Sequence, residues 1–149
     1  MQLYTSYFGK KAQLERAGIV PICIALWKPR WYTGIHYLPV APKAFMLKDG
    51  NQTQQQYIER YQKYVLDTLR VENVVRDIEC LSGGRDAALL CYEKPGEFCH
   101  RHLLAQWIME QSGVEVTEWM TEEERKAEEL RQKKEAAPKI VEPSLFDMF

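Results

Sequence analysis

The sequence lacks any apolar run of the roughly 18 residues that a helix needs to cross a bilayer. It also has almost no net charge, with 20 Lys and Arg against 21 Asp and Glu and a formal charge of −1 at pH 7. This balance excludes a general electrostatic attraction to nucleic acid or to acidic membranes. The opening residues, "MQLYTSYFGKKAQ", do not have the charged-then-apolar order of a signal peptide. We therefore expect a cytoplasmic protein that makes no membrane contact.

Cysteine is also sparse. The four cysteines, Cys23, Cys80, Cys91 and Cys99, are too few for the disulfide scaffold of a small secreted protein, so thiols are expected in a reducing cytosol. Histidine is scarcer still, at three residues. Reactive side chains nevertheless gather in one stretch, "LLCYEKPGEFCHRHLLAQWI", on either side of a Pro-Gly turn. This stretch is the first candidate for a functional site.

The arrangement of apolar residues predicts the fold class. "QLYTSYF", "IVPICIAL", "DAALLCYE" and "VEVTEW" read as strands, and the continuous apolar runs among them are typical of a buried parallel sheet. Helical spacing in "KKAQLERAG", "TQQQYIERYQKYVLDTLRVENVVRDIECL" and "EFCHRHLLAQWIMEQSG" separates these strands. The alternation predicts a three-layer, Rossmann-like α/β fold with a small, mainly parallel sheet.

The chain is expected to have three parts: an α/β domain over 1–120, a charged helical extension over 121–137 and a C-terminal tail over 138–149. The extension, "TEEERKAEELRQKKEAAPK", begins with a capping box and has almost no apolar residues, which predicts a solvated helix. Within the first part, "WKPRWYTGIHYLPVAPKAFMLKDG" contains three prolines and is predicted to lack regular structure. It would be either a ligand lid or a wrap that covers the core.

The Pro-Gly turn places its reactive residues where parallel sheets bind ligands. Cys91 and Glu93 stand at the carboxyl end of a predicted strand, and Cys99, His100 and Arg101 open the next helix. Unpaired N–H groups and the helix dipole favour anions and thiolates there. The guanidinium of Arg101 suits phosphate or carboxylate, and His100 suits proton transfer near neutral pH.

Three chemistries fit this cluster: a cysteine nucleophile with an anion cradle, a redox pair of cysteines, or a metal site of two cysteines and a histidine. Metal has the least support from spacing, because C-x₇-C-H lacks the paired ligands of structural zinc motifs and no fourth ligand is evident, so no metal is predicted. A purely structural alternative also stands, in which Cys91 and Cys99 are core residues and Arg101 pairs with Glu97.

Four segments, "YTSYF", "WKPRW", "LPVAP" and above all "LLCYEKPGEFCHRHLLAQWI", resemble the domain of unknown function 488 family over roughly residues 1–119. The resemblance implies a small α/β protein and no established activity. The positions it singles out are Thr5, Ser6, Pro29, Arg30, Cys91, Glu93, Cys99, His100 and Arg101. Many members carry a Thr-Ile-Gly-His-Ser-like motif on the first strand, but this chain reads Thr-Ser-Tyr-Phe, so the role of that histidine is not carried over.

The tail has a separate resemblance. "EPSLFDMF" is similar to the C-terminal peptides of the Gln-Leu-Ser-Leu-Phe type by which bacterial proteins dock on the replication sliding clamp, although Glu142 stands where Gln is expected. Its residues Leu145, Phe146 and Phe149 are strongly apolar for a chain end, which predicts that they bind a partner.

Two functions follow as hypotheses, and no particular cofactor is predicted for either. The first is an enzyme that binds a phosphate-bearing ligand, either a nucleotide or a nucleic-acid end. Its predicted catalytic residues are Cys91, Glu93, Cys99 and His100, and its predicted substrate-binding residues are Thr5, Ser6, Pro29, Arg30 and Arg101. The second is a non-catalytic interaction module, recruited to a replication or repair partner such as a sliding clamp through the tail.

Overall fold

The computed structural model of the protein describes residues 1–92 and 98–136. The chain divides into two compact units, Met1–Trp119 and Met120–Phe149. The first unit contains the sheet and every candidate site residue that the structure describes.

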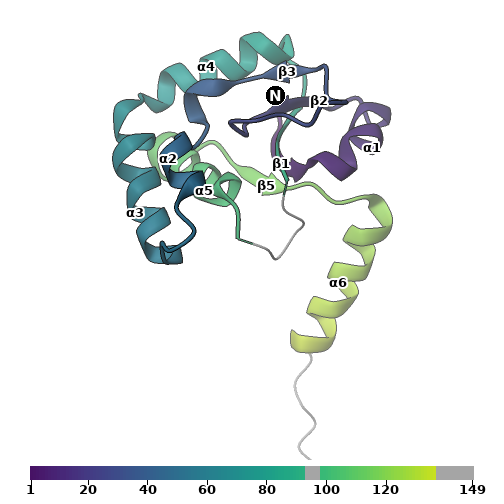
Figure 1. The fold of residues 1–149 in the computed structure, drawn as a ribbon. Helices are drawn as coiled ribbons and strands as arrows, with labels where there is room; N and C mark the ends of the chain where they lie inside the picture. The colour runs from purple at the N-terminus through teal and green to yellow at the C-terminus, as the bar shows by residue number, and fades with distance from the viewer. Residues whose placement is uncertain (93–97, 137–149) are drawn as a thin grey trace, which may run out of the picture. The chain divides into compact units, whose positions relative to one another are not determined.

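Five parallel strands form one sheet in the order β3-β2-β4-β1-β5 (Figure 1). The strands are β1 (Leu3–Tyr7), β2 (Val20–Cys23), β3 (Ile35–His36), β4 (Ala87–Cys91) and β5 (Val116–Glu118). The central strand β4 pairs with β1 and β2 on its two sides and is buried at every residue, as expected for the continuous apolar run AALLC. The predicted α/β fold with a parallel sheet is confirmed.

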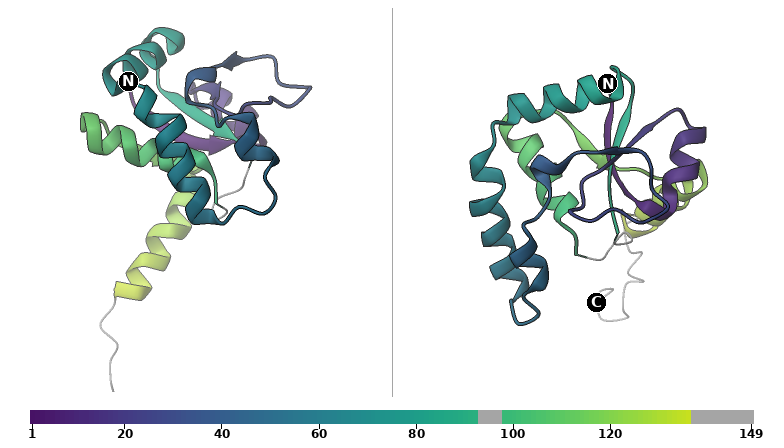
Figure 2. Two further views of the ribbon diagram at one scale, coloured as in Figure 1. Left: turned by 60° about the vertical axis from the view of Figure 1, so that its left-hand side comes forward. Right: turned by 45° about the horizontal axis from the view of Figure 1, so that its top comes forward.

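Helices cover both faces of this sheet. The helices of the first unit are α1 (Lys11–Arg16), α2 (Ala44–Lys48), α3 (Gln54–Tyr64), α4 (Val71–Ser82) and α5 (His100–Ser112). Figure 2 shows α1 on the side of the sheet opposite to α3, α4 and α5. Three layers result, in which α5 packs against β4, β1 and β5.

Two buried cores result from the alternation of side chains along the strands. Leu3, Ile22 and Leu89 belong to the larger core, together with side chains of α3, α4 and α5. Their neighbours in sequence, among them Cys23 and Leu90, point to the other face and pack with residues that include Leu14 and Tyr32. Strand residues on the same face as Leu3, Ile22 and Leu89 therefore point toward α5, and their neighbours in sequence point away from it.

The prediction that the proline-rich segment 27–50 lacks regular structure was wrong. It contains β3, a short 3-10 helix (Leu38–Val40) and α2. Pro39 is tolerated because it stands in the first turn of the 3-10 helix, where its missing N–H has no partner to lose. Tyr32 and Val40 are buried, so the segment packs into the core.

The second unit contains α6 (Glu122–Ala136), which has no buried residue. Thr121 stands immediately before it, and the Oγ1 of Thr121 accepts a hydrogen bond from the backbone N–H of Glu124 at 3.2 Å. The predicted partner-binding residues Leu145, Phe146 and Phe149 lie outside the described residues. Among the helices of the described ranges, none is both long and apolar enough to cross a membrane.

Replacing Tyr61 with Phe should lower the free energy of unfolding by about 1–3 kcal/mol. The Tyr61 hydroxyl donates to the carbonyl of Val40 at 2.7 Å inside the core, and the variant leaves that buried carbonyl without this donor. Urea denaturation checks the value. The matched control is Tyr64→Phe at an exposed position of the same helix, which should change stability little, and equal effects for the two variants would contradict the assignment.

Candidate functional site

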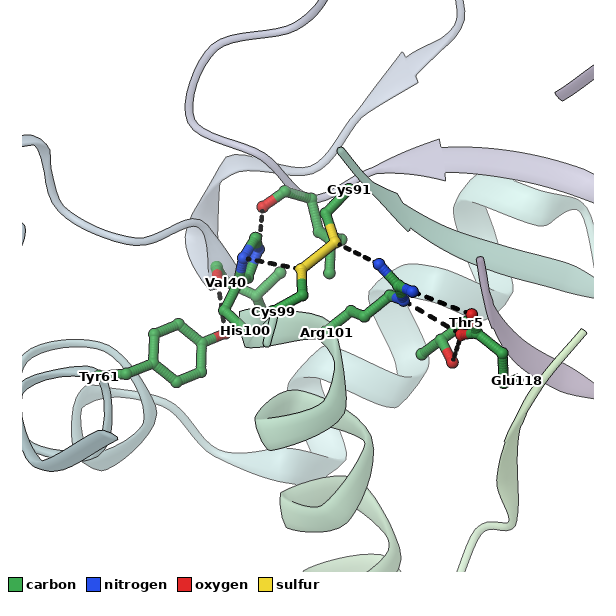
Figure 3. Close-up of a disulfide and its surroundings, with 9 residues drawn as sticks. Thr5, Val40, Tyr61, Cys91, Cys99, His100, Arg101 and Glu118 are labelled. Atoms are coloured by element: carbon green, nitrogen blue, oxygen red, sulfur yellow. Dashed lines mark hydrogen bonds and ion pairs between the residues drawn. A yellow bond between two sulfur atoms is a disulfide. The ribbon is translucent and has the colours of Figure 1, made fainter. Parts of the chain in front are cut away.

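Cys91 and Cys99 are joined as a disulfide at the carboxyl end of the central strand β4 (Figure 3). Cys91 is the last residue of β4 and has the same orientation as Leu89, toward α5. Cys99 is the residue immediately before α5 and occupies its N-cap position. The fold therefore brings the two sulfurs together from a strand end and a helix start.

The guanidinium of Arg101 lies next to the disulfide and has no exposed surface. Its Nη1 donates to the Sγ of Cys91 at 3.0 Å, while Nε and Nη2 donate to the two carboxylate oxygens of Glu118 at 3.1 and 3.0 Å. The hydroxyl of Thr5 donates to the same carboxylate at 2.7 Å. Glu118 thus balances the permanent charge of Arg101, and the guanidinium holds one sulfur (Figure 3).

His100 contacts the other sulfur. Its Nε2 lies 2.9 Å from the carbonyl oxygen of Ile24, which can only accept, so Nε2 carries a proton. Its Nδ1 lies 3.7 Å from the Sγ of Cys99. Burial lowers the pKa of His100 to about 4, so the ring is neutral at pH 7 and Nδ1 presents a lone pair toward that sulfur.

A cleft of about 420 Å³ opens onto this group, and both cysteines and His100 form part of its wall. Its other walls are mainly apolar and aromatic, with Trp27, Tyr57 and Phe98 among them. Of the described residues that line it, none is Lys or Arg. Cys99 is 3% exposed, so access to the sulfurs is narrow.

Five of the predicted site residues come together in the structure. They are Thr5, Cys91, Cys99, His100 and Arg101. Thr5 joins the group through Glu118. Glu93 lies outside the described residues.

Three predicted residues are not brought to this group. Ser6 follows Thr5 on the strand and therefore faces the opposite side of the sheet, where its buried Oγ has no hydrogen-bond partner among the described residues. Pro29 and Arg30 lie beyond β2, do not belong to the described wall of the cleft, and Arg30 is exposed. The guanidinium of Arg101, which was expected to form an anion clamp with Arg30, binds the carboxylate of Glu118.

Sequence reasoning missed two participants, Glu118 and the carbonyl of Ile24. A signal for Glu118 is present in "VEVTEW": Val116 is buried, and a residue two positions later on a strand points to the same face. A carboxylate on the core side of a strand requires a buried cation as its partner. A backbone carbonyl leaves no such signal in the sequence.

Replacing Glu118 with Gln should destabilise the fold by about 3–5 kcal/mol, because the buried guanidinium of Arg101 would lose the carboxylate that forms this ion pair. Chemical denaturation measures the loss. The control is Glu110→Gln on the exposed surface of α5, where the carboxylate accepts a hydrogen bond from Gln106. A loss for Glu118→Gln no larger than that of the control would contradict the view that this pair organises the site.

Comparisons with known proteins agree with the resemblance noted in the sequence. A family model described as the active DUF488-N3 subclade matches residues 26–112, more than half of the chain. The match includes both bonded cysteines, His100 and Arg101, and leaves β1 and Glu118 outside. No curated protein and no solved structure matches the chain. The chain therefore belongs to the domain of unknown function 488 family.

Proposed function

We propose that the protein is a cysteine-dependent redox enzyme in which Cys91 and Cys99 alternate between a disulfide and two thiols. The observation that carries the proposal is that the two bonded sulfurs line one cleft while each has a different polar partner. Of the three chemistries compatible with the sequence, a redox pair is the one that this bond supports directly. An inert structural disulfide would need neither a guanidinium nor an imidazole at its sulfurs.

Cys99 is the attacking thiol in this proposal. It caps a 13-residue helix, whose N-terminal N–H groups and dipole favour a thiolate. The Nδ1 of His100, which lies 3.7 Å from the Sγ of Cys99, is the acceptor for its proton. The thiolate attacks one sulfur of a disulfide substrate, a mixed disulfide forms at Cys99, and the first substrate thiol leaves with one proton.

Cys91 is the resolving thiol. Nη1 of Arg101 stabilises its thiolate form through a charge-assisted hydrogen bond. This thiolate attacks the Sγ of Cys99, which closes the Cys91–Cys99 disulfide and releases the second substrate thiol with the other proton. The substrate disulfide gains two electrons, and the cysteine pair loses two.

The walls of the cleft favour an uncharged or weakly cationic apolar substrate. Aromatic side chains such as Trp27 and Tyr57 dominate, and Asp49 is the charged residue among the described lining. A phosphate-bearing ligand, as expected from the sequence, would find no Lys or Arg among these residues. In a cytoplasmic location, which the proposal assumes, thioredoxin and glutathione would hold the pair as thiols at rest.

Recruitment to a sliding clamp or another partner through Leu145, Phe146 and Phe149 stays a prediction, since those residues are outside the described part of the chain. It is compatible with the redox proposal, because it concerns a different segment.

Single cysteine variants test the order of attack, in a Cys80→Ser background that removes the exposed thiol. The reduced background protein, treated with bis(2-hydroxyethyl) disulfide, should lose two hydrogens and keep no adduct, as read by intact mass. Cys91→Ser should stop at a stable mixed disulfide on Cys99. Cys99→Ser should form its adduct at least about tenfold more slowly, because Cys91 lacks the helix N-cap position and the adjacent imidazole.

Cys23 is the internal reference for slow adduct formation, since it is buried and burial raises the pKa of its thiol. Equal adduct rates for the Cys91 and Cys99 variants would contradict the assigned order. A background protein that retains all its thiols after treatment would overturn the redox proposal itself.

A further inference from the structure

We propose that the reduced site binds Zn²⁺ through the sulfurs of Cys91 and Cys99 and the Nδ1 of His100, with the fourth coordination position open to the cleft. One potential ligand atom from each of these residues lies within 4.8 Å of the others, and all three residues are buried. Two thiolates and an imidazole are a ligand set that zinc prefers. The proposal requires the thiol state of the site and does not require that the protein catalyse exchange.

The imidazole is already oriented as a ligand. Metal-binding histidines usually donate the N–H of their other ring nitrogen to a carbonyl or carboxylate, which fixes the ring and directs the lone pair to the metal. The Nε2 of His100 donates in this way to the carbonyl of Ile24. Its Nδ1 faces the sulfur of Cys99 at 3.7 Å, close to the roughly 3.6 Å edge of a tetrahedron built from usual Zn–S and Zn–N bonds.

The backbone spacing of the cysteines also leaves room for an ion. Their Cα atoms are 7.4 Å apart, and most disulfides span roughly 4.4–6.8 Å. Two sulfurs that bind one tetrahedral zinc lie about 3.8 Å from each other. Rotation of the two side chains away from each other therefore opens a position between the sulfurs without moving β4 or α5.

The charges of the reduced site favour a divalent cation. Two thiolates would add two negative charges to a buried group, and the charge of Arg101 is already balanced by Glu118. Buried charge without compensation is costly, and Zn²⁺ supplies the two positive charges that are missing. The guanidinium can keep its hydrogen bond to Cys91, as outer partners of ligating sulfurs commonly do.

The cleft determines what kind of zinc site this is. Structural zinc sites have four protein ligands, whereas sites with three keep a position for water or a substrate. Within residues 1–92 and 98–136, the grouped potential ligands are Cys91, Cys99 and His100, and all three line the cleft, so the fourth position faces it. A substrate thiolate or water would complete the coordination there.

Zinc binding and disulfide formation exclude each other, because both use the same sulfur lone pairs. When a disulfide substrate accepts two electrons from the pair, the sulfurs bond to each other and Zn²⁺ is released. The two substrate thiolates take up protons from solvent. The ion would therefore protect the thiols, and oxidation would expel it.

Cobalt titration of the reduced protein tests the site, since Co²⁺ reports thiolate ligands by a sulfur-to-metal charge-transfer band and tetrahedral geometry by visible d–d bands. In the Cys80→Ser background, one Co²⁺ per chain should give both signals, and Zn²⁺ should displace it. Cys91→Ser and Cys99→Ser should each weaken the charge-transfer band and the affinity. The disulfide form should give neither signal.

His100→Ala, which keeps both cysteines, should weaken cobalt binding by more than the roughly 10–100-fold that loss of an outer partner costs. The matched control is His102→Ala at an exposed position of the same helix, which should bind Co²⁺ as the background does. Circular dichroism verifies that each variant is folded.

The outcomes separate this inference from the redox proposal. Cobalt binding without any disulfide exchange supports the metal site and removes the redox function. Exchange by a folded, reduced protein that gives no cobalt signal overturns the metal site and leaves the redox function standing. Equal cobalt affinity in His100→Ala and His102→Ala would also overturn the site, because its third ligand would be wrong.

Discussion

The buried guanidinium of Arg101 is the constraint on which the rest of the site depends. It is positively charged, and it has no exposed surface through which water could solvate it. The fold must therefore provide acceptors on several sides. It does so with the carboxylate of Glu118 from β5 and the sulfur of Cys91 from β4, which ties the first turn of α5 to two strand ends.

The need of the Arg101 guanidinium for acceptors also affects the two cysteines. Any rearrangement that opens the contact with Glu118 removes a buried counter-ion of Arg101, and one that moves Cys91 removes a hydrogen-bond acceptor of its guanidinium. In the disulfide form the sulfur of Cys91 accepts a hydrogen bond from this guanidinium, while that of Cys99 is next to a neutral imidazole. Two chemically identical side chains thus have different environments, and the proposed redox function uses this asymmetry to assign attack to Cys99 and resolution to Cys91.

The parallel sheet supplies the geometry. Because all five strands run the same way, their carboxyl ends meet at one edge, and β4, β5 and the end of β2 contribute Cys91, Glu118 and the carbonyl of Ile24 to the same group. The hydroxyl of Thr5 joins from β1. Helix α5 then places Cys99, His100 and Arg101 against that edge. A site of this kind needs only one short segment of reactive residues, since strands from elsewhere in the chain complete it.

Several features could be predicted from the sequence because they depend on neighbours along the chain. Continuous apolar runs identified the buried strands, and helical spacing identified α3, α4 and α5. The proline-rich segment 27–50 was mispredicted, because strand β3 is only two residues long and exists through its pairing with β2. A pairing of that kind depends on a distant partner, and propensity within the segment does not reveal it.

The sequence alone determined the fold class and the concentration of Cys91, Cys99, His100 and Arg101 around one turn, since eleven consecutive positions contain all four. Only the tertiary structure decided their partners. Ile24 is 76 residues from His100 and Glu118 is 17 residues from Arg101, so neither contact follows from local spacing. The alternation along β1 turned Thr5 toward Glu118 and its neighbour away, because adjacent side chains of a strand must face opposite sides of the sheet.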